Sequence, residues 1–167
     1  MMKENIMRTI KIEKVILGVG GTGEVLEKGV KIIERVSLKK SVRTKSQKRI
    51  PSLSVRPGLE VGAVITIRKN PEEMLKRLLV AKENTLKKKQ ISENTFSFGI
   101  KEYIEIPGID YQRDLGIIGF DVIVTLKRAG KRVKIKKIKR GKIPARQRIT
   151  PEEIIKFMEE NFQTRFI

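Results

Sequence analysis

The fold class of this chain depends on one stretch, Thr9-Ile10-Lys11-Ile12-Glu13-Lys14-Val15-Ile16-Leu17-Gly18-Val19-Gly20-Gly21-Thr22-Gly23. Its first part predicts a strand over residues 9–19, because Ile10 and Ile12 alternate with charged residues and an apolar run follows. Residues 18–23 then spell G-x-G-x-x-G. Residues 24–36 predict a helix, and we expect its inward face to hold Val25, Leu26, Gly29, Val30, Ile32 and Ile33. A glycine turn between a strand and a helix is the setting of the dinucleotide-binding fingerprint.

An enzyme that binds a nicotinamide dinucleotide is therefore one alternative. That fold needs an acid about 20 residues after the glycines to hold the ribose hydroxyls. Residues 38–48 contain no acid, although an Arg there could accept the 2′-phosphate of NADPH. The chain also has no Cys and no His, which removes cysteine nucleophiles, the usual general base and the commonest metal ligand. We favour a tight turn without a ligand, and we expect no catalytic residue, no metal and no cofactor.

The rest of the chain does not repeat the order strand, helix, strand. Its main elements are two further strands and two further helices, predicted over residues 61–68, 96–106, 71–86 and 151–162. Asn70 and Thr150 precede the two helices as capping residues, each followed by Pro in the first turn. This pattern predicts one α+β domain over residues 1–167, with a mostly antiparallel sheet packed with about three helices.

The positive charge is concentrated in two stretches of a chain whose net charge is +19. Twelve of the 38 Lys and Arg residues fall between Lys127 and Arg148, and no acid lies between Asp121 and Glu152. A second stretch without acids lies between Glu34 and Glu60. Such a charge repels itself unless a polyanion neutralises it, and nucleic acid is the first candidate.

Residues 120–127 and 131–137 flank Arg128-Ala129-Gly130 and predict a basic C-terminal β-hairpin, with a loop that ends near residue 149. Its apolar residues, Val133, Ile135 and Ile138, alternate with cations, so we expect them to face a core while the cations line the other face. The cations of this predicted RNA-binding hairpin are Lys127, Arg128, Lys131, Arg132, Lys134, Lys136, Lys137, Lys139 and Arg140. Lysine contacts phosphates as a point charge, which favours structured RNA recognised by shape. The aromatic residues Phe96, Phe98, Tyr103, Tyr111 and Phe120 are assigned to the core and not to base stacking.

No apolar run reaches the roughly 18 residues that a membrane span needs. Residues 1–11 also lack the pattern of a secretory signal. We therefore expect an intracellular protein without a membrane partner. An RNA chaperone or regulator that acts outside the ribosome is a second alternative that the composition leaves open.

Three spaced motifs resemble the universal large-subunit ribosomal protein five family. They are Phe96-Ser97-Phe98-Gly99-Ile100-Lys101-Glu102, Ile106-Pro107-Gly108-Ile109-Asp110-Tyr111 and Gly116-Ile117-Ile118-Gly119-Phe120-Asp121-Val122. The resemblance extends over nearly the whole chain through Ile12-Glu13-Lys14-Val15, the glycine turn, Val42-Arg43-Thr44-Lys45, Ser54-Val55-Arg56 and Thr66-Ile67-Arg68. The basic hairpin and Thr150-Pro151-Glu152-Glu153 are similar to the archaeal and eukaryotic branch, so we expect an archaeal source.

The resemblance implies a non-catalytic α+β protein in the central protuberance of the cytoplasmic large ribosomal subunit. It implies partners that include 5S rRNA, large-subunit rRNA, peptidyl-site tRNA and neighbouring ribosomal proteins, among them a bridge protein of the small-subunit head. The positions that match rRNA contacts are Arg43, Lys45, Lys48, Arg49, Arg56 and Arg68. Residues 48–59 match the tRNA-contacting arm, which we expect to be mobile, with Lys48, Arg49, Ser52, Ser54 and Arg56 as its contacts.

Overall fold

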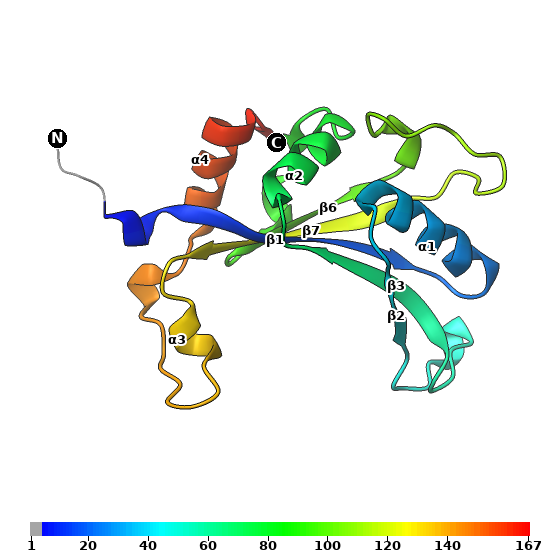
Figure 1. Cartoon of the computed structure of the whole chain (residues 1–167), viewed down its shortest axis with the longest axis horizontal. Coiled ribbons are helices and arrows are strands. Elements are labelled where there is room, and N and C mark those ends of the chain that lie inside the picture. The colour runs from blue at the N-terminus through cyan, green and yellow to red at the C-terminus, as the bar shows by residue number, and fades with distance from the viewer. Residues whose placement is uncertain (1–4) are drawn as a thin grey trace.

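The computed structural model describes residues 5–167, so the first four residues of the expected domain and of the 1–11 stretch lie outside it. A six-stranded sheet with the order β2-β3-β1-β7-β6-β5 forms the centre, and the main helices lie on one side of it (Figure 1). The elements are β1 (Ile10–Gly20), α1 (Glu24–Ser37), β2 (Val42–Lys45), β3 (Glu60–Ile67), α2 (Pro71–Val80), β4 (Thr85–Leu86), β5 (Ile91–Ser92), β6 (Thr95–Ile100), β7 (Phe120–Arg128), α3 (Arg132–Ile135), α4 (Pro151–Phe162) and β8 (Arg165–Phe166).

Strand β1 occupies the middle of the sheet and pairs antiparallel with both β3 and β7. The expected α+β class with a mostly antiparallel sheet is therefore confirmed. A dinucleotide-binding unit requires parallel neighbours at this position, so the topology contradicts the NADPH alternative. The glycines instead serve the fold: Gly23 is the N-cap of α1 at φ 60°, and Gly29 packs directly on Val19.

The core lies between the sheet and the helices. Val15 and Leu17 of β1 are fully buried, as are Ile33 of α1 and Leu75 of α2. Alternation along β1 sends these side chains to the helix side and leaves the other face of the sheet uncovered. The predicted inward face of α1 is confirmed except at Val25, which is exposed because it lies in the first turn, beyond the edge of the sheet contact.

The two predicted helix caps differ. Thr150 accepts a hydrogen bond from Glu153 N, and Glu153 accepts one from Thr150 N, so the capping box of α4 is confirmed. Asn70 lies at the N-cap of α2 but makes no capping bond, because its backbone is left-handed at φ 47° and its amide turns towards Glu73 instead. Helix α2 ends at Val80, several residues earlier than predicted.

The segment between β6 and β7 is an ordered loop. Strand β6 ends at Ile100, and residues 103–105 form a 3-10 turn in place of the predicted strand. Tyr103 is buried and its hydroxyl accepts a hydrogen bond from Gln112 N at 3.0 Å. Tyr111, which was assigned to the core, is 53% exposed, because the loop directs it to solvent.

The predicted basic hairpin is wrong. After β7, Gly130 makes a turn at φ 90°, and residues 132–135 form the short helix α3 where a strand was expected. Both edges of β7 are already taken, by β1 as far as Arg128 and by β6 as far as Thr125. A returning strand therefore has almost no free edge to pair with, and the chain leaves the sheet. Among residues 5–167, no helix is both long and apolar enough to cross a membrane.

Candidate nucleic-acid interface

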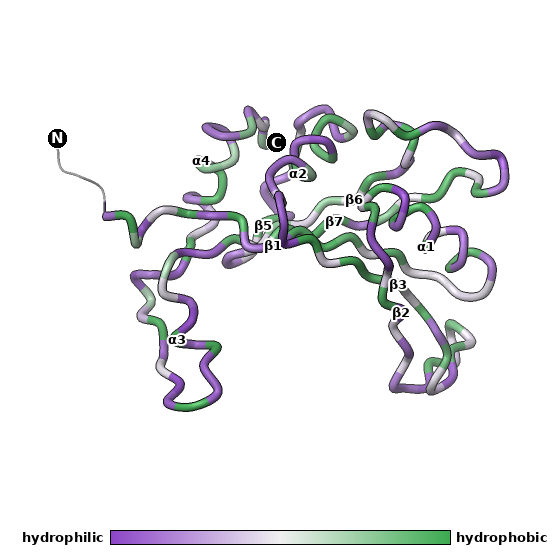
Figure 2. The backbone as a smooth tube through the Cα atoms, viewed as in Figure 1, coloured by the Kyte–Doolittle hydropathy of each residue, from purple (hydrophilic) through white to green (hydrophobic). Residues whose placement is uncertain are grey.

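The whole net charge of the chain lies on two segments, residues 38–59 and 127–148. Together they hold 19 of the 38 Lys and Arg residues and none of the 19 acids. The rest of the chain therefore carries 19 cations against 19 acids and is formally neutral. Figure 1 shows that both segments project from the side of the sheet opposite the helices, and Figure 2 shows how strongly hydrophilic they are. We name them the first projection (38–59) and the second projection (127–148).

The first projection is built on the β2–β3 pair. Ser46 N donates to Leu59 O and Gly58 N donates to Ser46 O, each at 2.8 Å, which closes its neck. At its tip Ile50 and Val55 form an isolated bridge around a 3-10 turn over residues 51–53. The predicted contact residues of this projection are exposed: Arg43, Lys45, Lys48, Arg49, Ser52, Ser54 and Arg56.

Two members of the predicted rRNA-binding set are placed differently from the rest. Arg43 pairs with Glu60 at 2.8 Å, so part of its charge is already neutralised within the chain. Arg68 follows the other end of β3, away from the first projection. The structure therefore brings together Lys45, Lys48, Arg49 and Arg56 but leaves Arg68 apart.

The root of the second projection is anchored by ion pairs to the body. The Arg128 side chain, only 9% exposed, donates to Glu153 Oε1 at 2.7 Å. It also donates to the carbonyls of Arg146 and Arg148 at 3.4 and 3.2 Å. Lys131 pairs with Glu13, the residue at the bulge of β1. Arg128 and Lys131, both predicted RNA contacts, thus hold the returning chain in place.

The same anchor perturbs the acid that receives it. Burial alone would raise the pKa of Glu153, but the hydrogen bonds from Thr150 N and Arg128 outweigh it and hold this pKa below its ordinary value. Glu153 is therefore a shared anchor for the cap of α4 and for the second projection.

The outer part of the second projection exposes cations and apolar side chains alike. The expected burial of Val133, Ile135 and Ile138 is wrong: Ile135 is 60% exposed and Ile138 is 76% exposed. Outside a sheet, alternation no longer separates two faces. The remaining predicted cations of this projection are all exposed: Lys127, Arg132, Lys134, Lys136, Lys137, Lys139 and Arg140.

Strand β1 relates the two projections. Its first residue, Ile10, pairs with Arg128 at the root of the second projection. Its last residue, Gly20, pairs with Gly62 beside the neck of the first. The projections therefore stand at opposite ends of one strand, with the uncovered sheet face between them.

The uncovered face is a part of the candidate interface that sequence reasoning missed. Many of its cross-strand neighbours are small or hydroxyl-bearing residues: Gly18, Gly62, Thr66, Thr95, Ser97, Gly99 and Thr125. A Cβ built at Gly18 or Gly20 would meet nothing within 4 Å, so packing inside the chain does not require glycine at either position. Such a face lets a partner approach the backbone closely. The alternation of these residues with buried ones was the available signal.

The fold and the charge distribution define a class: an α+β protein with a neutral body and two cationic projections. Comparison with known proteins is more specific. Residues 60–157 match the family model that describes the C-terminus of the ribosomal protein five family. Three relatives are each named "Large ribosomal subunit protein uL5". That of Nanoarchaeum equitans is 41% identical, over 98% of this chain and 99% of its own. Those of Sulfolobus acidocaldarius and Archaeoglobus fulgidus are 40% and 39% identical, over 99% and 93% of this chain and 95% and 89% of their own.

The chain belongs to the uL5 family of large-subunit ribosomal proteins, in its archaeal branch. The resemblance carried by the three sequence motifs is thereby confirmed. A member of this family is a ribosomal protein and not an enzyme, so the nicotinamide alternative is removed by kinship as well as by topology.

Proposed function

We propose that this chain is a structural constituent of the central protuberance of the cytoplasmic large ribosomal subunit, where it binds 5S rRNA and large-subunit rRNA. The observation that carries the proposal is the placement of all net charge on two projections at either end of an uncovered sheet face. Cationic projections contact phosphates on both sides, while the small residues between them admit a rigid RNA surface. Recognition is then by shape and charge.

We propose different RNA partners for the two projections. The first projection offers hydroxyls beside its cations, at Ser52 and Ser54, and takes peptidyl-site tRNA at its tip, residues 48–59. The second projection takes rRNA. The neutral helix layer on the opposite side stays available for neighbouring ribosomal proteins, including the bridge protein of the small-subunit head.

Filter binding tests the RNA assignment. An archaeal 5S rRNA and an unrelated structured RNA of equal length are compared over a salt series. We expect the 5S rRNA to bind at least about tenfold more tightly at every salt concentration, because shape complementarity adds to the charge term. Equal affinities throughout would reject specific 5S recognition. Absence of the chain from purified large subunits at moderate salt would favour the alternative of an RNA chaperone outside the ribosome.

A variant of the sheet face separates shape from charge. Gly18→Val adds a side chain where a Cβ meets nothing within 4 Å, so the fold is retained. We expect it to weaken 5S rRNA binding about tenfold or more without changing the slope against salt, because no cation is lost. Thr22→Val, at an exposed and uncharged position in the turn between β1 and α1, is the control outside the strands. Unchanged affinity of Gly18→Val would remove the sheet face from the interface.

A further inference from the structure

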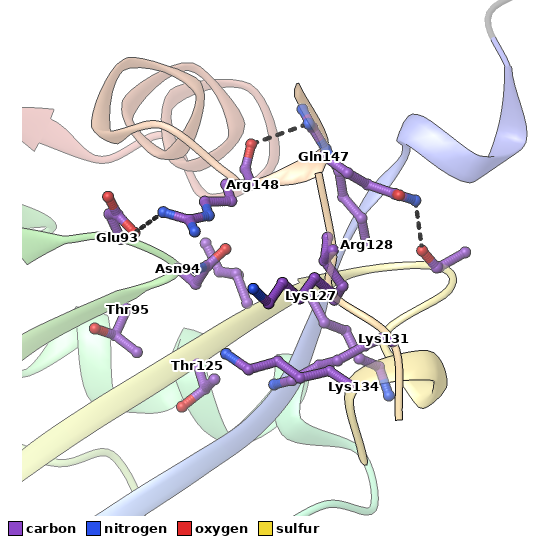
Figure 3. Close-up of a pocket in the computed structure, with 15 residues that line it drawn as sticks. Glu93, Asn94, Thr95, Thr125, Lys127, Arg128, Lys131, Lys134, Gln147 and Arg148 are labelled. Atoms are coloured by element: carbon purple, nitrogen blue, oxygen red, sulfur yellow. Dashed lines mark hydrogen bonds and ion pairs between the residues drawn. The ribbon is translucent and has the colours of Figure 1, made fainter. Parts of the chain in front are cut away.

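A pocket of about 610 Å³ lies at the root of the second projection (Figure 3). Its floor is the end of the uncovered sheet face, at Thr95 and Thr125, which are directly opposite each other on β6 and β7. Its walls are the cations of the outgoing chain and Gln147 and Arg148 of the returning chain. This volume is within the roughly 300–1,000 Å³ of pockets that hold small ligands.

The pocket selects an anionic ligand. Five cations besides Arg128 line it, and the only acid among its lining residues is Glu93, which pairs with Arg148 at 3.7 Å. Lys131 is held by Glu13, but within residues 5–167 neither Lys127 nor Lys134 has an acidic partner. The buried Nε of Arg128, on the same wall, also has no hydrogen-bond partner within the described chain.

The pocket also has fixed neutral groups that a phosphate alone does not need. Asn94 Oδ1 accepts from Ile149 N at 3.2 Å, so its amide NH₂ is the group left to donate. Gln147 Nε2 donates to Ala129 O at 3.0 Å, so its Oε1 is the group left to accept. An acceptor beside a phosphate is repulsive, whereas a donor and an acceptor with fixed orientation suit the polar edge of a base.

We propose that this pocket holds one unpaired nucleotide of the bound RNA. Its base contacts the Asn94 and Gln147 amides and the Thr125 hydroxyl, and its flanking phosphates contact Lys127 and Lys134. The nucleotide is unpaired because a pocket enclosed on three sides admits one base and excludes a helix. This inference rests on the proposed RNA-binding function and adds a site at which that RNA is read by more than charge.

The test uses two RNA hairpins with equal numbers of phosphates. One carries a single bulged 2-aminopurine and the other carries the same base paired in its stem. We expect the wild-type chain to bind the bulged hairpin about tenfold more tightly, and its fluorescence to change on binding. Thr125→Phe fills the floor without changing the charge, and should bind both hairpins with affinities within about twofold of each other. Thr66→Phe, on the same sheet face but outside the pocket lining, is the matched control and should keep the preference.

Each outcome has one meaning. A wild-type chain that binds both hairpins equally overturns the nucleotide pocket, while its affinity for 5S rRNA leaves the proposed function standing. A wild-type chain that binds neither hairpin nor 5S rRNA overturns the proposed function itself. A preference retained by a folded Thr125→Phe also overturns the pocket. If thermal melting shows that Thr125→Phe is unfolded, Thr125→Val, which removes only the hydroxyl, must lower the preference at least about threefold, or the inference fails.

Discussion

Gly29 faces Val19 across the contact between α1 and β1, where a Cβ would lie 2.4 Å from Val19 Cγ1. Alanine at this helical position would gain about 1 kcal/mol of propensity. The overlap with a β-branched side chain, however, costs about 1–3 kcal/mol. We expect Gly29→Ala to lower stability by about 1 kcal/mol net, and to lower the Tm by about 2–4 °C. Gly18→Ala, whose Cβ meets nothing, should melt with the wild type. An unchanged Tm for Gly29→Ala would contradict this account.

Glu153 makes the stability of the chain depend on pH. Its pKa is lowered in the folded state, so its contribution is complete above the ordinary carboxyl pKa and is lost as the pH falls through the folded value. We expect the Tm difference between wild type and Glu153→Gln to be largest near about pH 6–7 and to close below about pH 4. Thermal melting at intervals from about pH 7 to about pH 3 measures this difference. A difference that stays constant with pH would mean that the charge of Glu153 contributes nothing.

At the scale of elements, the second projection should act on RNA and not on the fold. Lys136, Lys137 and Lys139 are exposed and have no acidic partner within residues 5–167. We expect their joint replacement by Ser to leave the Tm unchanged. The slope of log K against log salt should fall by about 0.7–0.9 for each phosphate contact that is lost.

The matched control replaces three exposed lysines of the neutral helix layer, Lys31, Lys76 and Lys156, by Ser. It removes the same charge from α1, α2 and α4. We expect the salt slope to stay that of the wild type. Equal changes for the two triple variants would mean that only net charge matters and that its placement does not.

The elements that the sequence predicted well are those whose pattern is local. Strand β1, helix α1 and the capping box of α4 follow from apolar periodicity and from Thr150 and Glu153. The second projection could not be predicted in this way, because what excludes a hairpin is the pairing of β7 with β1 and β6, each distant in sequence. The internal roles of Arg128 and Lys131 depend on Glu153 and Glu13 and escaped prediction for the same reason.

At the scale of the whole molecule, a neutral body should make the free protein less sensitive to salt than a net charge of +19 suggests. The repulsion acts within each projection and not across the core. We expect the Tm of the free chain to change by no more than about 4 °C between about 0.05 and about 0.5 M NaCl, which corresponds to about 1 kcal/mol.

RNA should stabilise the chain through binding to the folded state alone. With 5S rRNA at about 100 times its Kd, linkage adds about 2.7 kcal/mol, or about 5–10 °C in Tm. Differential scanning fluorimetry with and without RNA measures this shift. A large rise in Tm with NaCl in the absence of RNA would show instead that the two projections strain the body.

The eleven residues of β1 run from the root of one projection to the neck of the other. At about 3.3 Å per residue, the strand acts as a rod of about 33–36 Å that sets the gap between the two groups of cations. One inserted residue would turn every later side chain to the opposite face and expose the inward row. The gap can therefore change only in pairs of residues, in steps of about 6.6–6.8 Å. The same rule that keeps the core closed makes this protein a gauge of fixed length for whatever lies across it.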